Sequence, residues 1–190
     1  MPHYLTMPAC LLLLGASLVA GAAQAFDHER YTTLARSGLG DISALIKNRP
    51  VDHQRLHATL DAMLALGVEG CRSFLGHPAA HRTLLELVLA ESATMTRLSK
   101  SEISEQWYRG DLPKEHGIDI VELDHFGDIS INYMDSIVHP AAAQILLREY
   151  QATGSLFSLK AARHELKEAI EHVDRLKPAT GNRGKTNSLD

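Results

Sequence analysis

One stretch, Glu122 to Tyr150, most constrains the fold that this chain can adopt. Read as a helix at about 100° per residue, its apolar residues cover an arc of roughly 200°, which is typical of a helix with neighbours on several sides. The polar residues left over form one narrow stripe, made of His125, Asp128, Asn132, Asp135 and His139. We therefore predict a central helix from about residue 119, which Pro140 either kinks or ends.

The rest of the chain also shows helical and not strand periodicity. Apolar residues recur every three or four positions in the segments 27–47, 52–66, 78–98 and 155–177. Gly38 and Gly40 predict a break or kink in the first of these segments. Ser99 and Glu102 form a capping-box pattern that predicts a short helix over 100–108, followed by a long loop over 109–117. The sequence thus predicts an all-α fold, an irregular bundle of about five to seven helices.

The first 25 residues have the pattern of an export signal. Residues 9–23 are almost wholly apolar, are too few to span a bilayer comfortably, and precede the small-x-small tripeptide Ala23-Gln24-Ala25. We predict a signal peptide over 1–25, cleaved after Ala25, with an uncleaved anchor as the alternative. A helical domain over 26–178 and a flexible tail over 179–190 complete the domain organisation, and the compartment is periplasmic or secreted.

Composition excludes several classes of function. Lys and Arg number 19 against 23 Asp and Glu, so no basic excess exists for nucleic acid or for an anionic membrane. Only Cys71 remains after the signal segment, which excludes an internal disulfide framework. The absence of a Cys-x-x-Cys-His motif excludes covalent c-type haem. No phosphate-binding glycine loop, nucleophile elbow or His-Glu-x-x-His motif is present, so the chain is not predicted to be an enzyme.

Ten of the eleven histidines follow the signal segment, and two pairs of them differ in their expected surroundings. His53 and His57 are spaced i, i+4 inside the apolar arc of the second helix, which is the spacing that a metal ion requires from one helix. The alternative, and the simpler interpretation, is that they are ordinary residues at the rim of the core. His164 and His172 lie on the charged face of the last helix, where we expect them to face solvent.

Two residues of the third helix extend the candidate set. Glu91 lies on the apolar face of that helix, and a buried carboxylate needs a cationic, hydrogen-bonding or metal partner. His81 lies near the same face, one turn after His77. A metal-binding interpretation therefore combines six residues: His53, His57, His81, Glu91, Asp135 and His139.

This set resembles the inward-facing carboxylates and histidines of hemerythrin-like and ferritin-like di-metal bundles. The resemblance implies a transition metal, namely iron, zinc or copper. The chain contains one Glu-x-x-His pair, Glu122 to His125, where a ferritin-like site has two. Its His-x-x-x-Glu pair, His164 to Glu168, lies on the charged face of the last helix.

Two functional hypotheses follow from these residues. The first is an exported protein with a binding or interaction role, whose partner is an unknown small ligand or periplasmic protein. Its candidate binding residues are His53, His57, Asp128, Asn132, Asp135 and His139. The second hypothesis is the metal-binding bundle. The central stripe as a plain solvent-facing side, and Glu91 as an ion-pair partner, are the structural alternatives.

Overall fold

The computed structural model describes residues 26–177, which form eight α-helices and one π-helical turn and contain no strand. The elements are α1 (His28–Ile46), α2 (His53–Phe74), α3 (Arg82–Met95), α4 (Lys100–Ile103), the π-helix (Ser104–Tyr108), α5 (Asp111–Glu115), α6 (Ile120–His125), α7 (Ile129–Thr153) and α8 (Leu156–Arg175). The all-α prediction is confirmed, but the described residues hold more helices than the five to seven predicted. The predicted signal peptide and tail lie outside the described residues.

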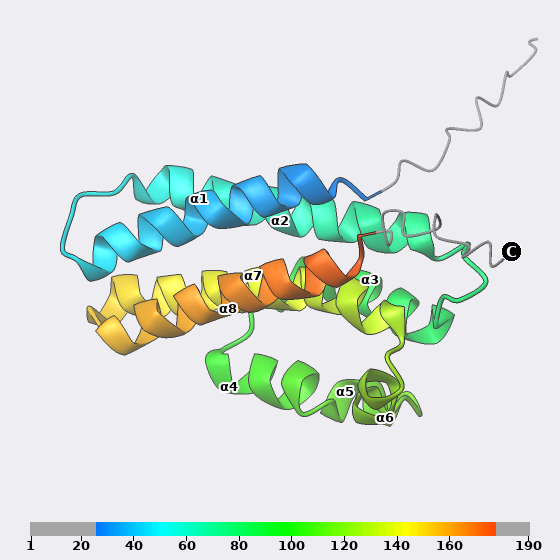
Figure 1. Cartoon of the computed structure of the whole chain (residues 1–190). Helices are drawn as coiled ribbons and strands as arrows, with labels where there is room; N and C mark the ends of the chain where they lie inside the picture. The colour runs from blue at the N-terminus through cyan, green and yellow to red at the C-terminus, as the bar shows by residue number, and fades with distance from the viewer. Residues whose placement is uncertain (1–25, 178–190) are drawn as a thin grey trace, which may run out of the picture.

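The long helices form two layers (Figure 1). α1 and α2 lie in one layer and α7 and α8 in the other, while the short elements α4 to α6 lie beside α7 on its far side. α7 packs against α8, α2 and α3, and α1 packs against α8 and α2. α7 is therefore the element around which the bundle is built, and the interface between α7 and α8 is the largest in the described chain.

Side-chain caps explain where the long helices begin. Asp27, Asp52 and Ser155 each accept a hydrogen bond from the backbone N–H three residues further on, at the starts of α1, α2 and α8. The predicted capping box is present at α4, where Ser99 and Glu102 bond each other's backbone N–H groups. These short polar residues satisfy N–H groups that have no partner within the helix.

α7 is buried along most of its length, and its boundaries differ from those predicted. Every residue from Ser130 to Leu147 except Asn132 is buried. The predicted helix from residue 119 is divided, because Gly127 adopts a positive φ of 70° and Asp128 then caps α7 as a separate helix. At the other end, α7 continues through Pro140 as far as Thr153. Packing on all sides maintains a helix that local sequence alone would weaken.

Two further predictions about breaks are wrong. α1 is continuous through Gly38 and Gly40. A Cβ added at Gly38 would lie 2.9 Å from a methyl carbon of Leu166, so this glycine permits α1 to approach α8 closely. The segment 109–117, predicted as a loop, contains the short helix α5.

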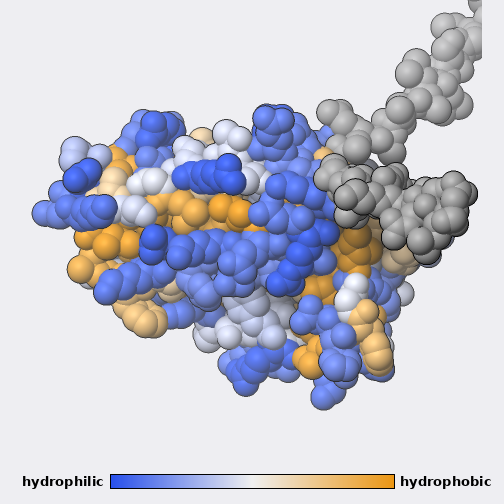
Figure 2. Space-filling view, in the orientation of Figure 1, coloured by the Kyte–Doolittle hydropathy of each residue, from blue (hydrophilic) through white to orange (hydrophobic). Residues whose placement is uncertain are grey.

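The surface shown in Figure 2 is mainly hydrophilic, with narrower hydrophobic bands between the polar side chains. The large apolar side chains that remain exposed include Val121 and Phe126, near α6, and Leu156 and Phe157, at the start of α8. None of the described helices combines the length and the hydropathy required to cross a bilayer.

Cys71 is buried and unpaired, and burial raises the pKa of its thiol to about 12. That thiol is a small core side chain and not a nucleophile.

Candidate metal centre

The candidate site lies where α7 packs against α8. Asn132, Asp135 and His139 occupy positions i, i+3 and i+7 of α7, a spacing that places side chains on one face of a helix. α8 contributes Glu165 and His172 to the same contact, and these are also seven residues apart. The polar groups therefore meet between the two most extensively packed helices of the bundle.

Two oxygen atoms of α7 hold the imidazole of His172. Its Nδ1 lies 3.1 Å from Oδ2 of Asp135 and 3.0 Å from Oδ1 of Asn132. The side chains of His172 and Asp135 are only 13% and 10% exposed. Because an amide oxygen can only accept, Nδ1 carries the hydrogen that it donates to Asn132. In the neutral imidazole this leaves Nε2 with a free lone pair, which is the form that binds a metal.

Glu165 holds the second imidazole, that of His139. Nδ1 of His139 lies 2.8 Å from Oε2 of Glu165, and both side chains are largely buried. The Tyr108 hydroxyl donates to the same carboxylate oxygen and lies 3.4 Å from Nδ1 of His139. Tyr108 ends the π-helical turn, a conformation that is frequent at functional sites. Donation from Nδ1 to Glu165 again leaves Nε2 for another partner.

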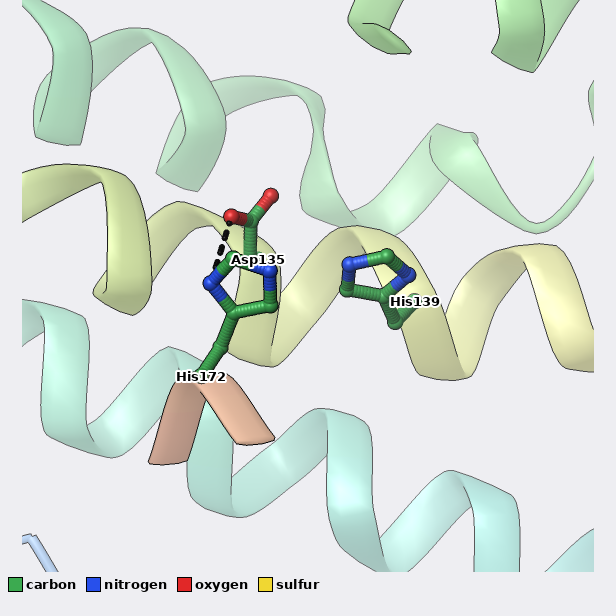
Figure 3. Close-up of side chains that lie close together, drawn as sticks. All are labelled: Asp135, His139 and His172. Carbon is green, nitrogen blue, oxygen red and sulfur yellow. Dashed lines mark ion pairs between the residues drawn. The ribbon is translucent and has the colours of Figure 1, made fainter. Parts of the chain in front are cut away.

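The two imidazoles are stacked against each other between α7 and α8. Their ring centroids lie 5.2 Å apart, with 25° between the ring planes. Figure 3 shows the rings of His139 and His172 side by side, with Asp135 next to His172. One ligand atom from each of these three side chains lies within 4.8 Å of the other two. This buried group can hold a metal ion.

Burial changes the protonation of all three groups. It raises the pKa of Asp135 to about 7, aided by the nearby carboxylates Asp124 and Glu168 and opposed by His139 and Arg175. It also lowers the pKa of His172 to about 4, with further lowering from the positive charges of His139 and Arg175.

His139 behaves differently from His172. Burial alone lowers its pKa, but the hydrogen bond to Glu165 and the negative charge of Asp135 outweigh that effect and raise the pKa overall. Burial therefore lowers the pKa of His172 and raises that of Asp135, while the acidic neighbours of His139 raise its pKa. A bound cation would favour the ionised carboxylate and the neutral imidazoles together.

The structure separates His53 and His57 from this centre. Both lie at the start of α2, where Gln151 bridges them: its Nε2 lies 3.3 Å from Nδ1 of His53 and 3.1 Å from Nε2 of His57. Gln151 follows His139 by twelve residues on α7, which is about 18 Å along the helix axis. The structure does not bring these two histidines together with Asp135 and His139.

The other predicted residues also lie elsewhere. His81 caps α3 and accepts a hydrogen bond from the N–H of Leu84, so α3 begins after it and not at Pro78. Glu91 is half-buried and accepts from the Thr94 hydroxyl of its own helix. Asp128 is the N-cap of α7. Of the predicted residues, the structure brings together Asn132, Asp135 and His139.

Sequence reasoning missed the residues that α8 contributes. His172 was expected to face solvent, yet it is buried against Asp135 and Asn132. Glu165 and Tyr108 were not singled out as site residues. A signal was present, because Glu165 and His172 lie seven residues apart on the same edge of the apolar face of α8.

Comparison with protein-family models, with curated proteins and with solved structures gives no match.

Proposed function

We propose that this chain is an exported helical-bundle protein that binds one divalent transition metal ion through Asp135, His139 and His172. The observation that carries the proposal is the mutual approach of the three donor groups, all within 4.8 Å, at a buried interface. A polar cluster of this kind is expensive to bury unless its members are paired or bind a cation. Export follows from the predicted signal peptide and is part of the proposal.

The donor set indicates which metals fit. Two imidazoles and one carboxylate suit Zn²⁺ and Fe²⁺, whereas Mg²⁺ and Ca²⁺ prefer oxygen ligands only. Cu²⁺ also accepts these donors, and the lack of a thiolate argues against Cu⁺. Three protein ligands leave at least one coordination position for water or for a further ligand, as in catalytic zinc sites.

The residues around the donors support the same assignment. Metal-binding histidines commonly donate their second ring N–H to a carboxylate or carbonyl oxygen, which fixes the tautomer and the ring orientation. Glu165 accepts from His139, and the Asn132 amide oxygen accepts from His172. Each imidazole therefore has an acceptor on Nδ1, which fixes the orientation of its ring.

The competing interpretation is a purely structural polar network. In this interpretation the polar side chains already pair with one another, through the Asp135–His172 and His139–Glu165 contacts, and need no ion. A general binding role without metal, for a small ligand or a periplasmic protein, belongs with this interpretation. The two differ in one measurable respect, because only a metal site gives stoichiometric and saturable binding that depends on His172.

Metal analysis and calorimetry of the purified chain from residue 26 onward test the proposal. The chain is stripped with EDTA and then titrated with Zn²⁺, and with Fe²⁺ under anaerobic conditions. We expect one ion per chain, and an ion at 100 times its dissociation constant should stabilise the fold by about 2.7 kcal/mol. His172→Ala should abolish this binding.

Matched variants make the outcome interpretable. His164→Ala removes an exposed histidine from the same helix and should leave the stoichiometry at one. His57→Ala removes a member of the separate surface pair and should also leave the tight site intact. Unchanged binding in His172→Ala, or no saturable binding in the unmodified chain, contradicts the proposal.

A further inference from the structure

A cavity of about 180 Å³ lies beside the metal centre, lined by α4 and the π-helix on one side and by α7 and α8 on the other. Its walls include Ile103 from α4, Ala142 and Leu146 from α7, and Ala161 from α8. A cavity of about 150 Å³ with apolar walls accommodates a molecule of the size of benzene. The hollow exists because two of the facing residues, Ala142 and Ala161, have the smallest side chain that bears a Cβ.

Part of the cavity lining is polar. Tyr108 and Glu165 belong to this lining, and both also contact His139. Glu165 already accepts at Oε2 from Tyr108 and His139, but a carboxylate has about four acceptor positions on its two oxygens. Among the described residues no donor bonds to its Oε1. Glu165 therefore offers a free acceptor, and a ligand that bonds to it supplies a hydrogen-bond donor.

The cavity lining has no net charge that favours an anion or a cation. Glu165 and Lys100, which both line the cavity, carry opposite charges. Lys100 is held near the cavity by its contact with the Phe157 ring, with Nζ lying 4.6 Å from the ring centroid. The best match is a neutral molecule with an apolar ring and one hydroxyl group.

We propose that this cavity is a binding site for a small neutral hydroxylated ring compound of the size of phenol, with the ring against Ala142, Leu146 and Ala161 and the hydroxyl donating to Glu165. The inference goes beyond the proposed metal site and does not depend on it, because the cavity walls include none of Asp135, His139 and His172. Glu165 and Tyr108 link the two sites, since both line the cavity and contact His139.

Phenol, toluene and benzoate are the probes for this proposal. Each is titrated into EDTA-treated, isotopically labelled protein, and amide chemical shifts are followed by NMR. We expect saturable shifts with phenol for residues of α4, α7 and α8 around the cavity. Toluene, which lacks the donor, should bind at least several-fold more weakly, and benzoate should not bind. No saturable shifts with phenol, or benzoate binding equal to that of phenol, overturns the proposal.

Two variants localise the binding. Ala161→Leu places a larger side chain in the cavity from a half-buried position and should weaken phenol binding at least tenfold. Ala93→Leu makes the same change at an exposed position of α3 and should leave binding unchanged. If Ala161→Leu binds phenol as tightly as the unmodified chain, the cavity is not the site.

A third variant separates this proposal from the metal proposal. His172→Ala removes a proposed metal ligand but no wall of the cavity, so phenol binding should persist in it. Metal binding without phenol binding overturns only the cavity proposal, and phenol binding without metal binding overturns only the metal centre.

Discussion

The hydroxyl of Tyr31 in α1 donates a hydrogen bond of 2.8 Å to the backbone carbonyl of Ser136 in α7. Four residues after Ser136 comes Pro140, which has no N–H to donate to that carbonyl. Tyr31 thus replaces the helical hydrogen bond that the proline removes, and it is fully buried while doing so. This contact explains how α7 continues through a proline at the centre of the bundle.

Tyr31→Phe should destabilise the fold by about 1–3 kcal/mol, since it leaves a buried carbonyl without a donor. Urea unfolding followed by circular dichroism measures the change. Pro140→Ala is the matched background, because its N–H can bond to Ser136 and should reduce the cost of Tyr31→Phe. An equal cost in both backgrounds means that the tyrosine does not compensate for the proline.

Gly67 marks a second close approach to the same carbonyl. A Cβ built on this residue of α2 would lie 2.6 Å from the carbonyl oxygen of Ser136, a backbone atom that cannot move aside cheaply. Gly67→Ala should therefore lower the midpoint of urea unfolding, with a cost of about 1–3 kcal/mol from overpacking. Gly40→Ala is the control, because nothing lies within 4 Å of its added Cβ. It should stabilise α1 by about 0.5–1 kcal/mol. Stabilisation by both changes contradicts the packing argument.

Sequence periodicity predicted the helical class and the burial of the central helix, because those depend on local spacing. It left open whether the central helix ends at Pro140, since the compensating donor, Tyr31, lies 105 residues away in the chain. Gly38 was interpreted as a break for the same reason: its role depends on the distant Leu166.

The same limit applies to the candidate site, where local sequence indicated some residues and not others. Asn132, Asp135 and His139 were recognised because they interrupt an apolar helix. His172 was not, because a polar residue at the edge of an amphipathic helix has the same pattern whether it meets solvent or another polar helix. Only the pairing of α7 with α8 distinguishes the two cases.

The Asp135–His172 pair predicts a distinctive dependence of stability on pH in metal-free protein. The pKa of His172, about 4 in the folded chain, lies below its ordinary 6.5, so its contribution to stability is lost as pH falls through that window. The pKa of Asp135, about 7, lies above its ordinary 3.8, so its contribution is lost as pH rises. Between about pH 4 and 6.5 the two effects oppose each other, and the net dependence due to the pair is small.

Single substitutions should show separately how each residue makes the free energy of unfolding depend on pH. His172→Gln leaves the effect of Asp135, so the free energy of unfolding should decrease from pH 4 to pH 6.5. Asp135→Asn leaves the effect of His172, so the free energy of unfolding of this variant should increase over the same pH range. Urea unfolding in EDTA at several pH values measures both, with His164→Gln as the exposed control. If the free energy of unfolding changes with pH in the same direction in both variants, the two residues do not have the opposite effects proposed.

Glu165 predicts how metal affinity depends on a residue that is not itself a proposed ligand. Its carboxylate holds Nδ1 of His139, and loss of such a partner typically weakens metal binding by about 10–100-fold. Glu165→Ala should show this loss in Zn²⁺ titrations. Glu165→Gln should lose less, because its amide oxygen can still accept from Nδ1 and only the negative charge is removed.

Tyr108→Phe tests the hydrogen bond that the Tyr108 hydroxyl donates to Glu165. It removes the hydroxyl that donates to Glu165 but keeps the ring against His139, so metal affinity should fall less than in Glu165→Ala. Urea unfolding of the metal-free variants is measured alongside, because Glu165→Ala also removes a buried partner of His139 and Tyr108. Equal metal affinity in Glu165→Ala and the unmodified chain means that His139 does not bind the ion in the orientation fixed by Glu165.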